Sequence, residues 1–470
     1  MIKSLIQNKY PLVWIILHLI LGFTATITPY VLIAWFYFVI LSSLSHVLKK
    51  NKSPFILISL LLYLVSFELL SRMARTSPFI PYELGKYLLA AGAIWGIFNF
   101  KTRGYSGIVM LVCLLPSLFI DLSGQVQRSD VVFNLLGAVN VALVCWFFYK
   151  QNFSSEELGK VVRLMVYPIL GILSYTFIKT PDFEEVEFVL GANVDLSGGF
   201  GSNQVSTLFG LGTLLVFILI ISRQTFSGNF ILDIAILFAL SFQGLLTFSR
   251  GGMIGAVLGV MIILFFLRRA SPLVRRKYHL PNVGKYVIPL ILVGILSFVV
   301  VDQITNGLLS LRYQGETMGT IQGSKVKTLN TISTGRFDIF MGDVNLWLDH
   351  FVFGVGAGAS RFLRESLTGT IAHVELSRLL AESGFLGLIY FVILSWLGVK
   401  LFRGQSNPLI KGILIALYIV AMYTTFHAAM RTYVTPSLLG LSLLAVKTSK
   451  KPKPKVRKKH SLKALEPIAS

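Results

Sequence analysis

An arginine and two glycines separate two long apolar runs in the stretch LLTFSRGGMIG, residues 245–255. A guanidinium group binds phosphate oxygens through two parallel hydrogen bonds. Arg250 stands where the second apolar run begins, and the free backbone N–H groups at the start of a helix also favour an anion. Ser249 can cap this helix, and Gly251 would let a ligand approach the backbone closely. The stretch therefore predicts a phosphate-binding site at one end of a helix.

Other polar residues could complete such a site. His373, in the segment TIAHVELSRLLAESGFLGL, is a candidate general base because an imidazole can be neutral near pH 7 and accept a proton. Glu375 is the reserve candidate for the same role. No second histidine stands at zinc-binding spacing from His373, so we expect no metal site. Five further arginines are expected on the same side of the membrane: Arg72, Arg75, Arg336, Arg378 and Arg431.

For any one of these arginines, contact with lipid headgroups is the simple alternative explanation. Several arginines at one boundary, with a histidine on a nearby loop, suggest more than that. Together they suggest transfer of a group from a lipid-linked diphosphate to a hydroxyl acceptor.

The elements that must position these residues are membrane-spanning helices. The chain has 470 residues, of which 54% are hydrophobic and only 14% are charged. Apolar runs of about 17–20 residues recur along it, and each is long enough to cross a bilayer as a helix. We therefore predict an all-α polytopic membrane protein with about 14 transmembrane helices. A large, partly helical periplasmic loop (303–383) lies between the eleventh and twelfth, and contains an amphipathic helix expected to lie on the bilayer surface.

The distribution of charge predicts the orientation. A net charge of +22 could indicate nucleic-acid binding. However, most lysines and arginines fall in the segments that are cytoplasmic if the N-terminus is cytoplasmic, as the positive-inside rule requires. Both termini are then cytoplasmic, and no nucleic acid is expected. The membrane domain is expected to span residues 1–446, followed by a basic tail (447–470) that is expected to be disordered and to lie against anionic lipid.

Four stretches carry a family resemblance. TFSRGG at 247–252, STGRFDIF at 333–340, HFVFGVGAG at 350–358 and AHVELSRLLAESGFLGL at 372–388 resemble, in order and spacing, the signature of the bacterial O-antigen ligase/polymerase superfamily. The resemblance implies a metal-independent glycosyltransferase without a cofactor, acting at the periplasmic face of the bacterial inner membrane. Its donor would be a glycan on undecaprenyl diphosphate. Its acceptor would be a glycan or a lipid-linked glycan, and other polysaccharide-assembly proteins are candidate partners.

By motif position, the resemblance implies that Arg250 and Arg336 contact the diphosphate and that His373 deprotonates the acceptor hydroxyl. Many members have asparagine directly after this histidine, where this chain has Val374. That departure favours a polymerase over a ligase. The segments 71–87 and 198–206 also look like those of exopolysaccharide polymerases. They add Arg72 and Arg75 as diphosphate-binding candidates and Asn203 as a substrate-binding candidate, beside Arg378 and Arg431.

Two other classes of protein stay open. A flippase for lipid-linked oligosaccharides would bind its cargo near the middle of the membrane, whereas charged residues here are nearly absent from mid-span positions. A non-catalytic assembly protein would not need Arg250, Arg336 and His373 to converge. The sequence does not name the sugar, the linkage or the acceptor, and a ligase remains the alternative to a polymerase.

Overall fold

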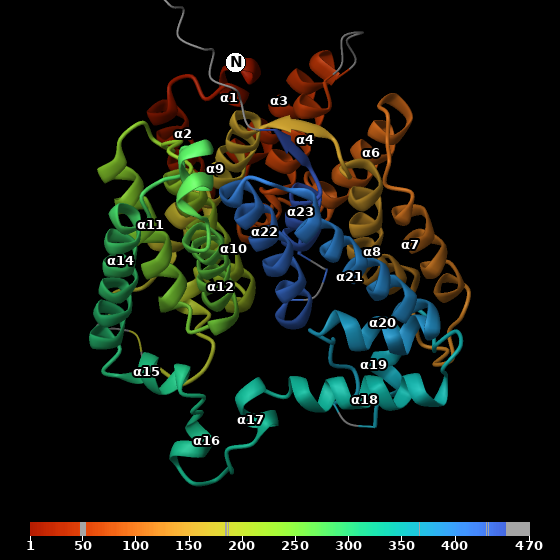
Figure 1. The fold of residues 1–470 in the computed structure, drawn as a ribbon. Helices are drawn as coiled ribbons and strands as arrows, with labels where there is room; N and C mark the ends of the chain where they lie inside the picture. The colour runs from red at the N-terminus through yellow and green to blue at the C-terminus, as the bar shows by residue number, and fades with distance from the viewer. Residues whose placement is uncertain are drawn as a thin grey trace, which may run out of the picture.

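The computed structural model describes residues 1–47, 53–183, 186, 188–365, 367–428, 430 and 432–447. Nearly all the regular structure in these ranges is helical (Figure 1). Of the predicted basic tail only Lys447 falls within the described residues, and Arg431 lies outside them.

The first part of the chain forms the N-terminal half of the bundle. Its elements are α1 (Ile2–Ile6), α2 (Pro11–Ala25), α3 (Tyr30–Val47), α4 (Pro54–Val65), α5 (Glu68–Met73), α6 (Leu84–Asn99), α7 (Ser106–Leu114), η1 (Pro116–Leu118), α8 (Arg128–Phe147), β1 (Asn152–Ser154) and α9 (Ser155–Lys179). The middle of the chain holds η2 (Asp195–Ser197), α10 (Ser202–Ile221), α11 (Phe230–Leu246), α12 (Arg250–Arg268), α13 (Pro272–Lys277) and α14 (Val283–Ile304).

Six helices follow before the chain returns to the bundle. They are α15 (Leu308–Tyr313), α16 (Met318–Ile321), α17 (Leu329–Ser333), α18 (Arg336–Asp349), α19 (Ser360–Leu363) and α20 (Glu375–Ser383). The last elements are α21 (Phe385–Gly404), α22 (Pro408–His427), α23 (Val434–Ser442) and β2 (Ala445–Lys447). β2 pairs in parallel with β1.

Nine helices in the described part of the chain are long and apolar enough to cross a membrane. Three shorter apolar helices, α2, α7 with η1, and α11, accompany them. These helices confirm an all-α polytopic membrane protein, while the number of about 14 spans stays a prediction. The membrane domain was predicted to extend to residue 446, whereas its last helix, α23, ends at Ser442 and the chain then forms β2.

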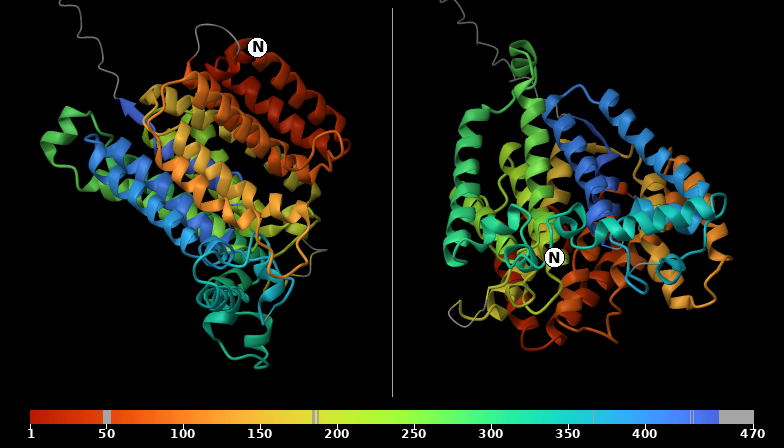
Figure 2. Two further views of the ribbon diagram at one scale, coloured as in Figure 1. Left: turned by 90° about the vertical axis from the view of Figure 1, so that its right-hand side faces the viewer. Right: turned by 90° about the horizontal axis from the view of Figure 1, so that it is seen from below.

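The segment from α15 to α20 lies at one end of the bundle, opposite the N-terminus and β2 (Figure 1). α18 crosses this end of the bundle, as the view from below also shows (Figure 2). It occupies the stretch that was predicted to form an amphipathic helix; Phe337 and Leu348 of the predicted apolar face are exposed, whereas Ile339, outside that face, is buried. Its position on a bilayer surface stays a prediction.

The glycine-rich stretch of HFVFGVGAG is a turn that joins this segment to the bundle. Gly354, Gly356 and Gly358 all have positive φ, which strongly favours glycine. A Cβ on Gly354 would lie 2.5 Å from the carbonyl oxygen of Ala381, and one on Gly356 would lie 1.8 Å from that of Ile120. Gly354 and Gly356 therefore allow close packing against α20 and the segment that follows η1.

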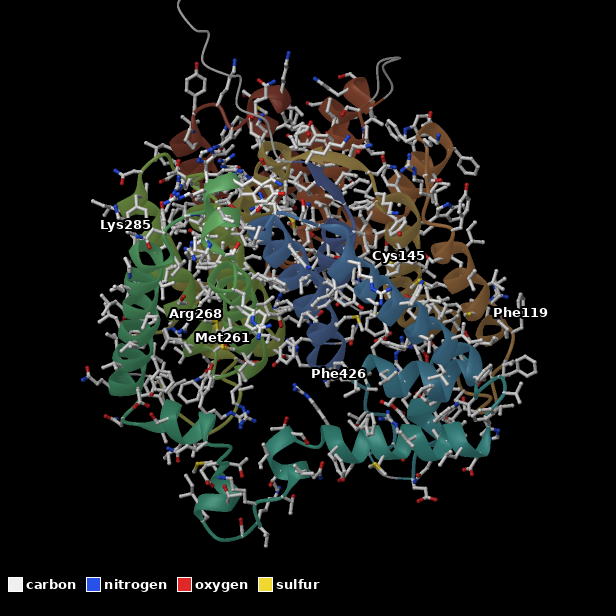
Figure 3. The ribbon with its side chains drawn as sticks, in the orientation of Figure 1. Phe119, Cys145, Met261, Arg268, Lys285 and Phe426 are labelled. Atoms are coloured by element: carbon white, nitrogen blue, oxygen red, sulfur yellow. The ribbon has the colours of Figure 1, made fainter. Side chains whose placement is uncertain are left out.

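The start of α12 is held between α10 and α22. A Cβ on Gly252 would lie 2.1 Å from the carbonyl oxygen of Ser206 on α10, and one on Gly251 would lie 2.4 Å from the His427 ring on α22. Phe426, next to His427, lies at the end of the bundle that faces α17 and α18 (Figure 3). Glycines thus allow three helices to meet at the end of the bundle where Arg250 begins α12.

Candidate functional site

Three arginines from separate segments line one pocket. Arg250 is the first residue of α12, Arg336 is the first residue of α18, and Arg312 lies in the last turn of α15. The pocket that they share has a volume of about 350 Å³. Asn203, Ser249 and Gly251 also line it, so five residues predicted from the sequence lie together.

Hydrogen bonds to backbone carbonyls fix two of these arginines. Arg250 donates from its two terminal nitrogens to the carbonyl oxygens of Arg312 (3.1 Å) and Ile332 (2.6 Å). Arg312 in turn donates from Nε to the carbonyl oxygen of Phe248 (3.3 Å). The start of α12, the end of α15 and α17 are therefore tied together around the pocket.

The start of α12 keeps its backbone donors uncapped. Ser249 is the N-cap residue, but its hydroxyl accepts no bond from the first turn of the helix. It bonds instead to Oδ1 of Asn203 (3.3 Å), whose amide nitrogen donates to the carbonyl oxygen of His427 (2.9 Å). α18 also begins without a side-chain cap, after Gly335 with φ 82°. Two helix N-termini, each of which favours an anion, thus border the pocket.

The pocket is strongly positive. None of the residues that line it is acidic. The Arg336 guanidinium makes no hydrogen bond or ion pair with any residue in the described part of the chain. Burial, together with the charges of Arg250 and Arg336, lowers the pKa of Arg312 to about 10, and burial also lowers the pKa of Arg336. A pKa of about 10 still leaves Arg312 charged near pH 7, so the pocket suits a ligand with several negative charges.

A second, apolar cavity adjoins the arginines. It has a volume of about 640 Å³ and lies between α11, α12 and α14, with Leu245, Met253, Val257 and Phe298 among the residues that line it. Tyr313, which follows Arg312 directly, lines it too. Because neighbouring residues on α12 and α15 line the two cavities, a polar site and an apolar site meet at the end of the bundle.

His373 lies beside this region without lining the pocket. It is exposed and lies on a bend two residues before the first residue of α20, rather than in the predicted helix. Its charge and that of Arg336 both act electrostatically on His427. Since the His427 ring lies against Gly251, which lines the pocket, this electrostatic effect indicates that His373 is within range of the arginine pocket.

Residues 234–392 match the family model described as O-antigen ligase. This match supports the resemblance to the O-antigen ligase/polymerase superfamily and a function of the ligase or polymerase type. No curated protein matches the sequence. The matched ligase segment extends from α11 into α21, so it contains all three pocket arginines and His373.

Two other predicted residues of the ligase segment lie elsewhere. Arg378 is 1% exposed and ion-pairs with Glu375 and Glu382 on its own helix, while it donates to the carbonyl oxygen of Asn134 (3.0 Å). Glu375 is fully buried and also accepts the backbone N–H of Met430 (3.1 Å). Both residues therefore help to pack α20 against the bundle, while the predicted substrate-binding role of Arg378 and the reserve-base role of Glu375 stay predictions.

Arg72 and Arg75 are not brought to the pocket either. Arg72 forms ion pairs with Glu68 (3.0 Å) and Glu83 (2.8 Å), which leaves its charge balanced within α5 and the start of α6. Arg75 is exposed, with φ 54°. Neither lines the arginine pocket, so their assignment to diphosphate is not supported by position. Arg431 lies outside the described residues, and its role stays a prediction.

Arg312 is the pocket residue that sequence reasoning missed. It stands in SLRYQGE, a stretch without glycine pairs or motif neighbours, and no apolar span begins there. The only available signal was another arginine in the loop that already contained Arg336. Its proximity to Arg250 depends on how the segment from α15 to α18 folds back beneath α12.

Proposed function

We propose that this protein is a metal-independent membrane glycosyltransferase. It transfers a glycan from undecaprenyl diphosphate to a sugar hydroxyl at the periplasmic face of the bacterial inner membrane. The reaction that we favour is polymerisation of O-antigen or exopolysaccharide repeat units.

The observation that carries this proposal is the composition of the arginine pocket. Three guanidinium groups and two uncapped helix starts surround a space of about 350 Å³ without a lining carboxylate. A diphosphate would neutralise these charges, and each guanidinium can bind its oxygens in a bidentate manner. The adjoining apolar cavity of about 640 Å³ offers a place for the first isoprene units of the lipid chain.

The chemistry follows from these positions. The acceptor hydroxyl attacks the anomeric carbon, the bond from that carbon to the phosphate oxygen breaks, and its electron pair leaves with undecaprenyl diphosphate. Arg250, Arg312 and Arg336 stabilise the charge that develops on the leaving oxygen. His373 accepts the proton of the acceptor hydroxyl. Its exposed position next to the pocket suits a base that must meet an acceptor from the periplasm.

An O-antigen ligase is the second candidate, because the family description names that activity. A ligase would use the same donor and the same arginines but would pass the finished glycan to lipid A-core or another acceptor. Val374, where many ligases have asparagine, favours the polymerase.

The test is to delete the protein in its host and to separate the cell's glycans on a gel. A lost polymerase leaves acceptors with single repeat units, whereas a lost ligase leaves long chains on the undecaprenyl carrier. Arg312→Ala and Arg336→Ala should reproduce the deletion at normal membrane levels of the protein.

Arg75→Ala is the matched control, because it removes an arginine outside the pocket. It should retain wild-type glycans. The proposal fails if the pocket variants retain normal glycans, or if deletion changes no undecaprenyl-linked glycan at all.

A further inference from the structure

Two aromatic rings of α22 lie against two glycines of α12, next to the arginine pocket. Tyr423 and His427 are four residues apart on α22, and their ring centroids lie 4.8 Å from each other. Gly251 and Gly255 are likewise four residues apart on α12. A Cβ on Gly251 would lie 2.4 Å from the His427 ring, and one on Gly255 would lie 3.3 Å from the Tyr423 ring. The spacing of four residues places each pair on one helix face.

The environment of Tyr423 is set by the arginines. The charges of Arg250 and Arg336 both act on its hydroxyl group. Tyr313, which follows Arg312 and lines the apolar cavity, also interacts electrostatically with Tyr423. Tyr423 therefore lies one helical turn from His427, whose ring contacts the pocket-lining Gly251, and within range of the charges of the arginines.

The Tyr423 hydroxyl has no hydrogen-bond partner in the described part of the chain. Tyr418, one turn earlier on the same helix, donates its hydroxyl to the carbonyl oxygen of Leu394 (2.8 Å). Tyr390 on α21 likewise donates to the carbonyl oxygen of Ala138 (2.8 Å). A hydroxyl without a protein partner can bond to a ligand, and the charges of Arg250 and Arg336, which act on it, favour an anionic one.

We infer that the Tyr423 hydroxyl donates a hydrogen bond to the lipid diphosphate held by Arg250 and Arg336. This inference rests on the proposed function and adds an uncharged donor to the three arginines. A phenol one helical turn from the pocket-lining Gly251 would contact the phosphate side of the lipid–phosphate bond, while its ring stays between α12 and α22. The absence of a side chain at Gly255 lets the Tyr423 ring pack closely against α12.

The experiment measures binding of undecaprenyl diphosphate to the full-length protein in nanodiscs. Tyr423→Phe removes the hydroxyl and keeps the ring, so the contacts with Gly255 and His427 remain. A hydrogen bond to a charged group is a strong one, and we expect affinity to fall about 10-fold or more. Tyr418→Phe is the matched control, because it removes one hydroxyl from the same helix outside the pocket, and its affinity should stay within about twofold.

A thermal melt of each variant accompanies the binding measurement. The inference is supported if Tyr423→Phe melts like the wild type but binds about 10-fold more weakly. It is overturned if Tyr423→Phe binds like the wild type while Arg250→Ala loses binding, a result that leaves the proposed function intact. If the wild type itself does not bind undecaprenyl diphosphate, the inference and the proposed donor both fail.

Discussion

Gly251→Ala should impair transfer while leaving the protein folded in the membrane. The added Cβ would lie 2.4 Å from Cδ2 of His427, whereas ordinary contact begins at 3.4 Å, so the His427 ring or the start of α12 must move by about 1 Å. A shift of this size in a catalytic arrangement costs about 100-fold in rate. Overpacking costs about 1–3 kcal/mol of stability, and the higher helix propensity of alanine offsets up to about 1 kcal/mol of that.

Alanine substitutions at two other glycines should show smaller losses of activity, in the order of how closely the added Cβ meets its neighbours. On Gly255, a Cβ would lie 3.3 Å from the Tyr423 ring, so Gly255→Ala should cost activity only a few-fold. On Gly294, in α14, a Cβ would have nothing within 4 Å, so Gly294→Ala should be neutral. The assay measures glycan chains in a deletion strain that expresses each variant, with membrane levels followed by immunoblot. Wild-type activity in Gly251→Ala, or an equal loss in Gly294→Ala, would refute the reasoning.

Three further predictions concern other parts of the molecule. Arg378→Ala leaves Glu375 and Glu382 buried without their cation, and should lower stability by about 3–5 kcal/mol, seen as loss of monodisperse protein in detergent. Burial raises the pKa of Asp343 to about 6 from 3.8, against the opposing effect of Arg364. The stability that Asp343 contributes is thus present at low pH and lost as the pH rises from about 4 to 6. The melting temperature of Asp343→Asn should therefore change less with pH over that range than the melting temperature of the wild type. Val257→Trp fills the apolar cavity and should weaken use of undecaprenyl-linked donors more than of farnesyl-linked ones.

Much of the fold could be predicted from the sequence because bilayer thickness constrains helix length. The apolar runs around Arg250 became α11 and α12, with Arg250 as the first residue of α12. The amphipathic pattern after Arg336 likewise became α18. Helix boundaries were less predictable where no periodicity marks them: Ser66 and Phe67 separate α4 from α5, and β2 follows α23.

The pocket was only partly predictable. Arg250, Arg336 and Asn203 were accessible to motif and loop arguments, whereas Arg312 stands in a stretch with no local signal. Arg378 shows the opposite limit, because an arginine that pairs with carboxylates three and four residues away looks the same in sequence whether it is buried or exposed. Long-range packing decides whether Arg312 reaches the pocket and whether Arg378 is buried, and the residues adjacent in sequence do not indicate it.

The most direct measurement of the central claim is an experimental structure of the protein with undecaprenyl diphosphate bound. We expect both phosphates within hydrogen-bonding distance of Arg250, Arg312 and Arg336, with the lipid chain entering the cavity between α11, α12 and α14. A diphosphate bound at Arg72 and Arg75, or anywhere else outside the pocket between α12, α15 and α18, would contradict the claim.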